Sequence, residues 1–221
     1  MKKLLPALFL LALGACATAP AGTSICSNDS GMREGRFFTF WHDTGEGCMT
    51  LRPGGGYAVD WRLGARGNLV AGTGWGRGTL DRVVRYKAEA FDPGRNGYLT
   101  LYGWSTDPLI EYYVVDSWGG FEPPGNQATA LGTLQSDGAT YRIYRTQRVQ
   151  QPSIRGTQTF YQYWSVRETR IPVGTDSTIT FANHVAAWRA AGLELGTMNY
   201  QVLATEGFGS DGNSVIDISG F

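Results

Sequence analysis

The stretch GYLTLYGWSTDPLIEYYVVDSWG, residues 97–119, contains two runs rich in tyrosine, leucine and valine on either side of a short polar turn. This pattern predicts two β-strands, in which successive side chains point to opposite faces. Glu111 and Tyr113 then share one face of the second strand, and Tyr102 and Trp104 share one face of the first. A half-buried carboxylate costs desolvation free energy unless its charge or proton is used. Glu111 is therefore a candidate functional residue.

A second glutamate, Glu206, lies in the similar run NYQVLATEGF, and Gln162 lies in TFYQYWSV. If the strand faces that carry these residues, Glu111 and the nearby tyrosines coincide, they form a concave surface lined by carboxylates, phenols and an amide. Sugar rings stack on aromatic faces, and their hydroxyls need fixed hydrogen-bond partners. Two carboxyl groups that face one groove can cleave a glycosidic bond, one as acid and the other as nucleophile or base.

Short alternating runs separated by glycine-rich turns continue from residue 33 to the end of the chain. The sequence has 31 Gly, 9 Pro and 13% aromatic residues. These features predict an all-β fold, a sandwich of strongly twisted antiparallel sheets. A chain of 221 residues is long enough for one domain with a full hydrophobic core.

One segment, ANHVAAWRAAG, predicts a helix instead. Asn183 can cap its first turn, Val185 and Trp188 lie on one face, and Gly192 can end it. The apolar stripe is narrow, so we expect the helix to pack on the outside of a sheet. His184 falls in the first turn, where we expect a structural hydrogen bond and no catalytic role.

The charge pattern excludes several classes of function. There are 19 basic and 19 acidic residues, and removal of Lys2 and Lys3 with a leader would leave the chain slightly acidic. No basic field exists to attract nucleic acid. The two histidines, His42 and His184, have no ligand-like spacing to the cysteines, so we expect no metal site.

The first residues are typical of a lipoprotein leader, which we assign to residues 1–15. Lys2 and Lys3 precede an apolar run over residues 4–13, and the LGAC motif that ends at Cys16 resembles a lipobox. Such a segment is too short to remain as a membrane-spanning helix. We therefore expect Cys16 to become the lipidated first residue, and the lipid to be the chain's link to a membrane.

Ordinary secretion, with cleavage among residues 17–19, is the alternative. Residue 17 is not the aspartate associated with inner-membrane retention, so an outer-membrane or cell-surface location follows in a Gram-negative host. Residues 16–32 are small and polar at their start and are predicted to form a tether, and residues 33–221 the β-domain. Cys26 and Cys48 form an even pair in an oxidising compartment, where a disulfide is expected.

Several of these motifs, in this order, resemble those of the family-11 endo-β-1,4-xylanases. They are GYLTLYGW, PLIEYYVVDSWG, YRTQRVQQPSI, TFYQYWSV and YQVLATEG, and the resemblance runs from Phe37 to Ile218. It implies a β-jelly roll of two twisted antiparallel sheets, usually likened to a right hand, with a single α-helix packed on the outer face and a cleft across the palm. It also implies cleavage of internal xylan bonds with retention of configuration, without a cofactor.

The resemblance assigns roles by position. Glu111 corresponds to the nucleophile and Glu206 to the general acid/base. The positions that correspond to cleft residues, four of them (Arg148, Pro152, Ser153 and Ile154) on a thumb loop, are Trp41, Asn68, Tyr102, Tyr113, Arg148, Pro152, Ser153, Ile154, Gln162 and Tyr200. The family carries Asp or Asn at the position of Asn68, beside the acid/base. An aspartate would draw activity toward acid pH, so Asn68 implies a neutral or mildly alkaline optimum.

Some positions depart from the family pattern. The opening reads Gly35-Arg36-Phe37-Phe38 where tyrosines are common, and Thr73 stands where lysine is common. We expect these changes to weaken binding at the far end of the cleft. Two alternatives to a monomeric xylanase remain: a carbohydrate-binding sandwich without catalysis, and a related jelly-roll β-1,4-glucanase. The rate of reducing-end release from xylan and from carboxymethylcellulose would distinguish the three.

Overall fold

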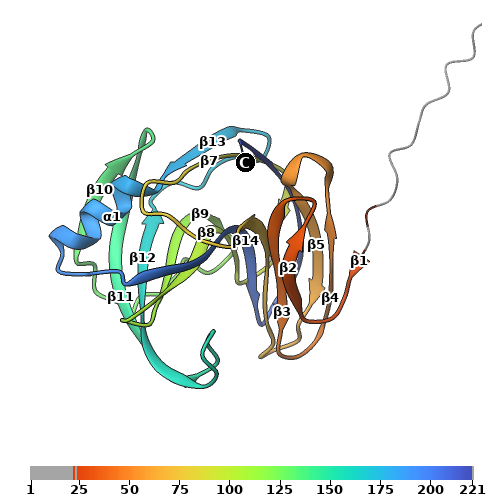
Figure 1. Ribbon diagram of the computed structural model, residues 1–221, viewed down its shortest axis with the longest axis horizontal. Coiled ribbons are helices and arrows are strands. Elements are labelled where there is room, and N and C mark those ends of the chain that lie inside the picture. The colour runs from red at the N-terminus through yellow and green to blue at the C-terminus, as the bar shows by residue number, and fades with distance from the viewer. Residues whose placement is uncertain (1–21, 23, 221) are drawn as a thin grey trace, which may run out of the picture.

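The computed structural model describes residue 22 and residues 24–220. The predicted leader, Cys16 and the alternative cleavage positions lie outside this part of the chain. The described residues form two β-sheets and one α-helix, α1 (Figure 1). The strands are β1 Ser24–Ile25, β2 Asp29–Arg33, β3 Arg36–His42, β4 Glu46–Leu51, β5 Tyr57–Arg62, β6 Asn68–Trp75, β7 Val83–Asp92, β8 Gly97–Thr106, β9 Ile110–Trp118, β10 Gly132–Ser136, β11 Ala139–Gln151, β12 Gln158–Arg167, β13 Asp176–Thr180, β14 Thr197–Phe208 and β15 Asp211–Ser219.

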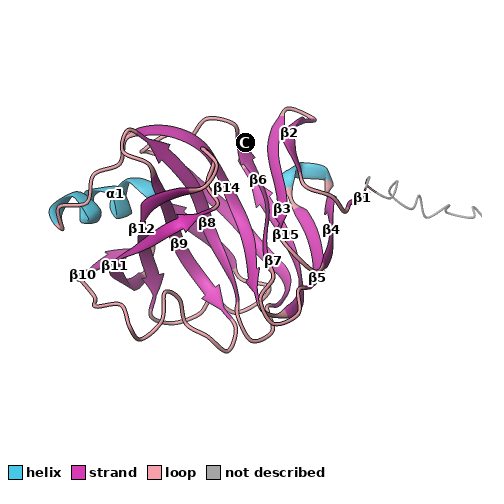
Figure 2. Ribbon diagram, turned by 90° about the horizontal axis from the view of Figure 1, so that it is seen from below, coloured by secondary structure: helices cyan, strands magenta, loops and turns pink. Residues whose placement is uncertain are grey.

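The smaller sheet has the strand order β1-β4-β5-β15-β7-β13, and the larger has the order β10-β11-β12-β9-β8-β14-β6-β3-β2. The two sheets pack against each other along the molecule, and their strands twist strongly (Figure 2). The predicted all-β jelly roll is confirmed. Within the described residues, no helix is long and apolar enough to span a membrane.

Alternation along the strands separates the two faces of the larger sheet. On β8, Leu99 and Leu101 belong to the core between the sheets, whereas Tyr102 and Trp104 belong to a second cluster on the opposite face. We call this opposite face the site face. Its buried cluster consists of Val70, Tyr98, Tyr102, Trp104, Tyr113, Val115, Trp118, Tyr144, Phe160, Trp164, Val166, Val202 and Ala204.

One strand pair differs from the antiparallel arrangement expected from the sequence, because β12 pairs with β9 in parallel. Parallel neighbours need a connection long enough to carry the chain back along the sheet. Residues 119–131 make this return, so β10 runs in the same direction as β9. The antiparallel pairs β10–β11 and β11–β12 then place β12 parallel to β9.

Helix α1, Phe181–Ala190, packs on the larger sheet opposite the site face, as predicted (Figure 1). Val185 and Trp188 are buried in the inter-sheet core. Its start was predicted wrongly: Thr180 holds the N-cap position, and Asn183 lies inside the helix, where its amide donates to Ser136 Oγ. The helix begins at Phe181, before the predicted cap Asn183, because the apolar side chain of Phe181 is buried against the sheet.

The prediction for His184 is only half right. Its ring is buried edge-on against Tyr141, and neither ring nitrogen has a hydrogen-bond partner among the described residues. Burial lowers the pKa of His184 to about 3, so the ring is neutral at physiological pH. The histidine therefore fills core volume beneath the helix without the expected hydrogen bond.

The N-terminal boundary also needs correction. The expected tether reaches residue 32, but β1 pairs with β4 and β2 pairs with β3, so residues 24–32 already belong to the folded domain. The backbone of this segment is bound by strand pairing, which its small polar side chains did not reveal. The predicted disulfide between Cys26 and Cys48 is present and fastens this segment to the smaller sheet.

Candidate active site

Glu111 and Glu206 lie on the site face of three adjacent strands, β9, β8 and β14. Strand β8 runs between the other two, with Trp104 opposite Glu111 and Tyr98 opposite Glu206. The exposed fractions of the two glutamates are 7% and 6%. The charge of Glu111 raises the pKa of Glu206, so the carboxyl groups are coupled electrostatically. Sequence positions far apart are thus brought into one site, and the condition that the two strand faces coincide is met.

Glu111 is held by two neutral donors. Tyr102 Oη donates to Oε1 at 2.7 Å, and Gln162 Nε2 donates to Oε2 at 2.7 Å. Burial raises the pKa of Glu111, while these donors act against the rise by stabilising the ionised form. The carboxylate is thereby fixed in orientation without being neutralised by an ion pair.

The donor groups are themselves oriented by further side chains. Trp104 Nε1 donates to Tyr102 Oη at 2.7 Å. Thr146 Oγ1 donates to Gln162 Oε1 at 2.9 Å, and Trp164 Nε1 donates to Thr146 Oγ1 at 2.9 Å. Since its oxygen accepts from Thr146, the Gln162 amide must turn its nitrogen toward Glu111. These chains of hydrogen bonds preorganise the nucleophile position.

Glu206 has a different environment. Burial, together with the charge of Glu111, raises its pKa to about 8, and the hydroxyls of Tyr98 and Tyr113 partly oppose this rise. Its Oε2 is buried and has no hydrogen-bond partner among the described residues. Glu206 is therefore protonated at neutral pH and has an oxygen free of partners. Such a group can donate a proton to a substrate.

Stacked aromatic rings form the rest of the site face. Tyr113 stacks on Trp164 with ring centroids 3.9 Å apart, and Phe37 stacks on Tyr200 at 5.2 Å. Trp41 lies at the edge of this cluster on β3 and is only partly buried. The buried rings shape the site, while partly exposed rings such as Trp41 remain open to a ligand.

Asn68 begins β6, the strand next to β14. Its partner in the ladder is Phe208, and Val70 lies opposite Glu206, so Asn68 is the diagonal neighbour of Glu206 on the same face. The backbone N–H of Asn68 donates to Asp43 Oδ1 at 2.7 Å, which fixes the start of the strand. The structure therefore places Asn68 near the acid/base candidate, as predicted.

The predicted thumb residues lie at the far end of the hairpin formed by β11 and β12. Arg148 is exposed on β11 close enough to both glutamates for its charge to lower their pKa values. Pro152, Ser153 and Ile154 lie in the connection between the strands, and Ile154 packs against the site-face cluster. All twelve predicted catalytic and cleft positions therefore lie on the larger sheet or its hairpin.

The expected effect of Thr73 is not supported. Its side chain points to the inter-sheet side of β6, is buried, and donates to the Gly55 carbonyl oxygen. A residue on that face cannot contact a ligand on the site face. Thr73 therefore connects the two sheets through its hydrogen bond and does not face the site.

Four side chains of the site were not assigned roles from the sequence: Tyr98, Trp104, Thr146 and Trp164. Tyr98 and Trp104 share the strand face of Tyr102, so the alternation pattern alone could have identified them. Thr146 gives no such signal, because its role arises from hydrogen bonds to two residues of a neighbouring strand. Among the described residues, no group of three or more His, Cys, Asp or Glu side chains could hold a metal ion.

Two buried, coupled carboxyl groups on one face of an aromatic-rich β-sheet are the equipment of a glycoside hydrolase. Residues 33–217 match the family described as Glycosyl hydrolases family 11, and the chain belongs to this family.

The chain is similar to several curated relatives. It is 48% identical over 207 residues to Endo-1,4-beta-xylanase Xyn11B of Cellvibrio japonicus, which covers 92% of this chain and 58% of the relative. It is 49% identical over 212 residues to a Bifunctional xylanase/xylan deacetylase of the same organism, and the match covers 95% of this chain and 32% of the relative. It is 45% identical over 221 residues to Ethylene-inducing xylanase 1 of Botryotinia fuckeliana, and the match covers 95% of this chain and 76% of the relative. The chain thus spans about a third to three quarters of these relatives.

Proposed function

We propose that the chain is an endo-acting glycoside hydrolase that cleaves internal β-1,4-xylosidic bonds of xylan with retention of configuration. The observation that carries this proposal is the placement of Glu111 and Glu206 on one face of neighbouring strands, where burial and the charge of Glu111 raise the pKa of Glu206 to about 8. Membership of family 11 and the xylanase names of three relatives support the choice of substrate.

In the first step, the Glu111 carboxylate attacks the anomeric carbon and forms a glycosyl ester. The glycosidic C–O bond breaks, and the leaving oxygen takes the proton of Glu206. Tyr102 and Gln162 hold the two oxygens of Glu111 in place, so the attack requires little reorganisation. Two neutral donors also keep the carboxylate nucleophilic, since no cation among the described residues forms an ion pair with it.

In the second step, water replaces the departed part of the chain. Glu111 no longer carries a charge, so the electrostatic contribution that raised the pKa of Glu206 is gone. Glu206, which gave up its proton in the first step, therefore remains ionised and removes a proton from the water, which attacks the anomeric carbon and releases Glu111. The two displacements on opposite sides of the ring give net retention.

We assign substrate contacts to the side chains around the two carboxyls and along the hairpin. Trp41 offers a partly exposed ring for stacking on a distal sugar, and Arg148 stands where its charge reaches the reacting centre. Tyr200 and Tyr113 complete the aromatic wall beside Tyr102. The backbone at residues 152–154 would contact the sugar chain from the hairpin.

The remaining predictions concern the cell and the assembly. We propose a secreted protein held at the outer membrane or cell surface by lipid on Cys16, acting as a monomer. The LGAC motif at residues 13–16 supports the anchor. Metabolic labelling with a fatty acid, compared between the natural chain and Cys16→Ser, tests it, and equal labelling of the two would contradict the anchor.

Product analysis tests the function itself. The purified chain should release reducing ends from xylan as a series of short oligosaccharides and much more slowly from carboxymethylcellulose. Nuclear magnetic resonance of the first products should show the β-anomer before mutarotation. Binding to xylan without release would favour a carbohydrate-binding module, and faster release from carboxymethylcellulose would favour a glucanase.

A further inference from the structure

The tip of the β11–β12 hairpin, residues 152–157, lies outside the strand ladder, whose last pair is Gln151 with Gln158. Short hydrogen bonds hold it in a compact turn: Ser153 Oγ accepts from the Arg155 N–H at 3.0 Å and donates to the Gly156 carbonyl at 2.7 Å. The tip is therefore a defined unit at the end of a long hairpin, and its position over the site depends on contacts with other elements.

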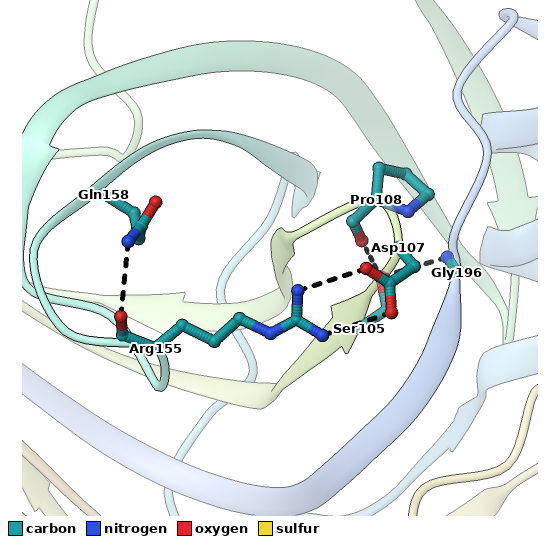
Figure 3. Close-up of polar contacts among 6 residues, drawn as sticks. All are labelled: Ser105, Asp107, Pro108, Arg155, Gln158 and Gly196. Carbon is teal, nitrogen blue, oxygen red and sulfur yellow. Dashed lines mark hydrogen bonds and ion pairs between the residues drawn. The ribbon is translucent and has the colours of Figure 1, made fainter.

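Arg155 makes the polar contact of this tip with another part of the described chain. Its Nη1 and Nη2 lie 3.1 Å and 3.1 Å from the two carboxylate oxygens of Asp107, a bidentate ion pair (Figure 3). Asp107 belongs to the turn between β8 and β9. Hydrogen bonding to Arg155 and its charge lower the pKa of Asp107 from its usual range, which favours the ionised form that the pair requires.

The turn that carries Asp107 is firmly placed. Ser105 Oγ donates to the Pro108 carbonyl at 3.3 Å and accepts from the Gly196 N–H at 3.1 Å (Figure 3). A Cβ on Gly196 would overlap the Thr106 carbonyl oxygen, so the two segments meet at backbone contact. The turn also precedes Glu111 directly on β9, and its position is therefore fixed relative to the nucleophile.

We propose that Asp107 and Arg155 are positioning residues that hold the hairpin tip at a fixed distance from Glu111. The bidentate pair connects the tip to the β8–β9 turn, and Ile154 then packs against the site-face cluster. Neither charged side chain needs to touch the substrate. The pair acts through the tip residues 152–154, and so it sets the affinity for the sugar chain more than the rate of bond cleavage. This proposal rests on the proposed function.

Both partners are exposed, with side-chain exposed fractions of 49% for Arg155 and 74% for Asp107. Exposed pairs are weak individually and are screened by salt. The contact that positions the tip is therefore sensitive to ionic strength, and high salt should loosen it.

Two neutralising variants test the proposal, Asp107→Asn and Arg155→Gln. Asparagine tolerates the positive φ of residue 107, so the turn is preserved while the charge is lost. We expect KM for xylan to rise about two- to fivefold in each variant, with a smaller change in kcat. Arg155→Lys should recover part of the loss, and the natural protein in about 1 M salt should approach the variants.

Amide hydrogen exchange of residues 149–158 provides a readout that needs no substrate. Exchange at the tip should be faster in both variants than in the natural protein. The matched control is Arg189→Gln, which breaks an ion pair with Glu194 of similar exposure on the opposite side of the sheet and should change neither KM nor tip exchange. Unchanged KM and unchanged exchange in both test variants, or an equal effect in the control, would overturn the proposal. If the natural protein does not cleave xylan, the proposed function fails, but the exchange data still decide whether the pair holds the tip.

Discussion

Strand β9 carries two buried carboxyl groups on opposite faces. Their hydrogen-bond donors are chemically similar, but the two groups have different roles. Glu111 faces the site and accepts from Tyr102 Oη at 2.7 Å. Asp116 faces the inter-sheet core and accepts from Tyr86 and Tyr141 hydroxyls, each at 2.6 Å. Burial raises the pKa of Asp116 to about 6, and its two phenols oppose the rise, much as the donors to Glu111 do.

The difference lies in what else faces each carboxyl. Asp116 connects strands from both sheets, since Tyr86 lies on β7 and Tyr141 on β11, and both hydroxyls donate their hydrogen bonds to it. Glu111 instead faces Glu206, a second ionisable group with a free oxygen. A buried carboxyl that is bound by hydroxyls from both sheets is therefore a structural tie, and one that lies beside a second buried carboxyl with a free oxygen is a candidate catalyst.

The largest effect that follows from this comparison is expected for Glu111→Gln. Glutamine can accept one of the two hydrogen bonds through its amide oxygen but cannot form the glycosyl ester, so kcat should fall by about a thousandfold or more. Stability should change little. Initial rates on xylan and a thermal melt measure both quantities, and a rate within tenfold of the natural protein would refute the nucleophile assignment.

Glu206→Gln should also be nearly inactive, with kcat on xylan down by about a hundredfold or more, and should be more stable near neutral pH. In the unfolded chain the carboxyl ionises near its ordinary pKa of about 4.3, whereas in the folded protein it keeps its proton up to about 8. Between these two pKa values the unfolded state binds fewer protons than the folded state. The free energy of unfolding of the natural protein therefore falls as pH rises through this range.

Glutamine does not ionise in either state, so the variant escapes this loss. We expect a gain on the order of 1–3 kcal/mol at pH 7 and little gain near pH 4. Denaturant titrations at the two pH values provide the measurement. A variant that is equally stable at both pH values, relative to the natural protein, would show that the pKa of Glu206 is not raised by folding.

Removal of one tyrosine hydroxyl that donates to a carboxyl group, on one face of β9 and then on the other, should separate a structural role from a catalytic one. Tyr86→Phe removes a donor to buried Asp116 and should cost about 1–3 kcal/mol above pH 6, where Asp116 is ionised, and less as pH falls. Activity per folded molecule should be kept. Tyr102→Phe removes a donor to Glu111 and should lower kcat/KM by about tenfold or more with a smaller loss of stability. Paired melts and kinetics would contradict the comparison if both variants lost the same property.

The smallest effect concerns pH. The alkaline limb of kcat/KM should report ionisation of Glu206 at about pH 8, and the optimum should lie near neutrality. In Asn68→Asp a new carboxyl would share one proton with Glu206. Loss of that proton would end activity, and it would occur at lower pH than the ionisation of Glu206 in the natural protein. We expect the optimum to move about one unit toward acid. An optimum of the natural protein below about pH 4.5 would contradict the role of Asn68.

Much of the site could be predicted because strand alternation is a local property. That Glu111 shares a strand face with Tyr113, and Tyr102 with Trp104, follows from the period of two, and the structure confirms it. The disulfide followed from the number of cysteines outside the leader. The helix start and the end of the tether were predicted wrongly, because each depends on packing or pairing with residues far away in the sequence.

The sequence by itself determined which side chains share a face, since backbone geometry alone sets that pattern. Tertiary structure decided which strands lie side by side. The parallel pairing of β12 with β9 brings Gln162 opposite Glu111, and the order β9-β8-β14 brings Glu206 within electrostatic reach of Glu111. Proton affinities, the orientation of the Gln162 amide and the tie between Arg155 and Asp107 all arise from these non-local contacts, which short-range patterns do not encode.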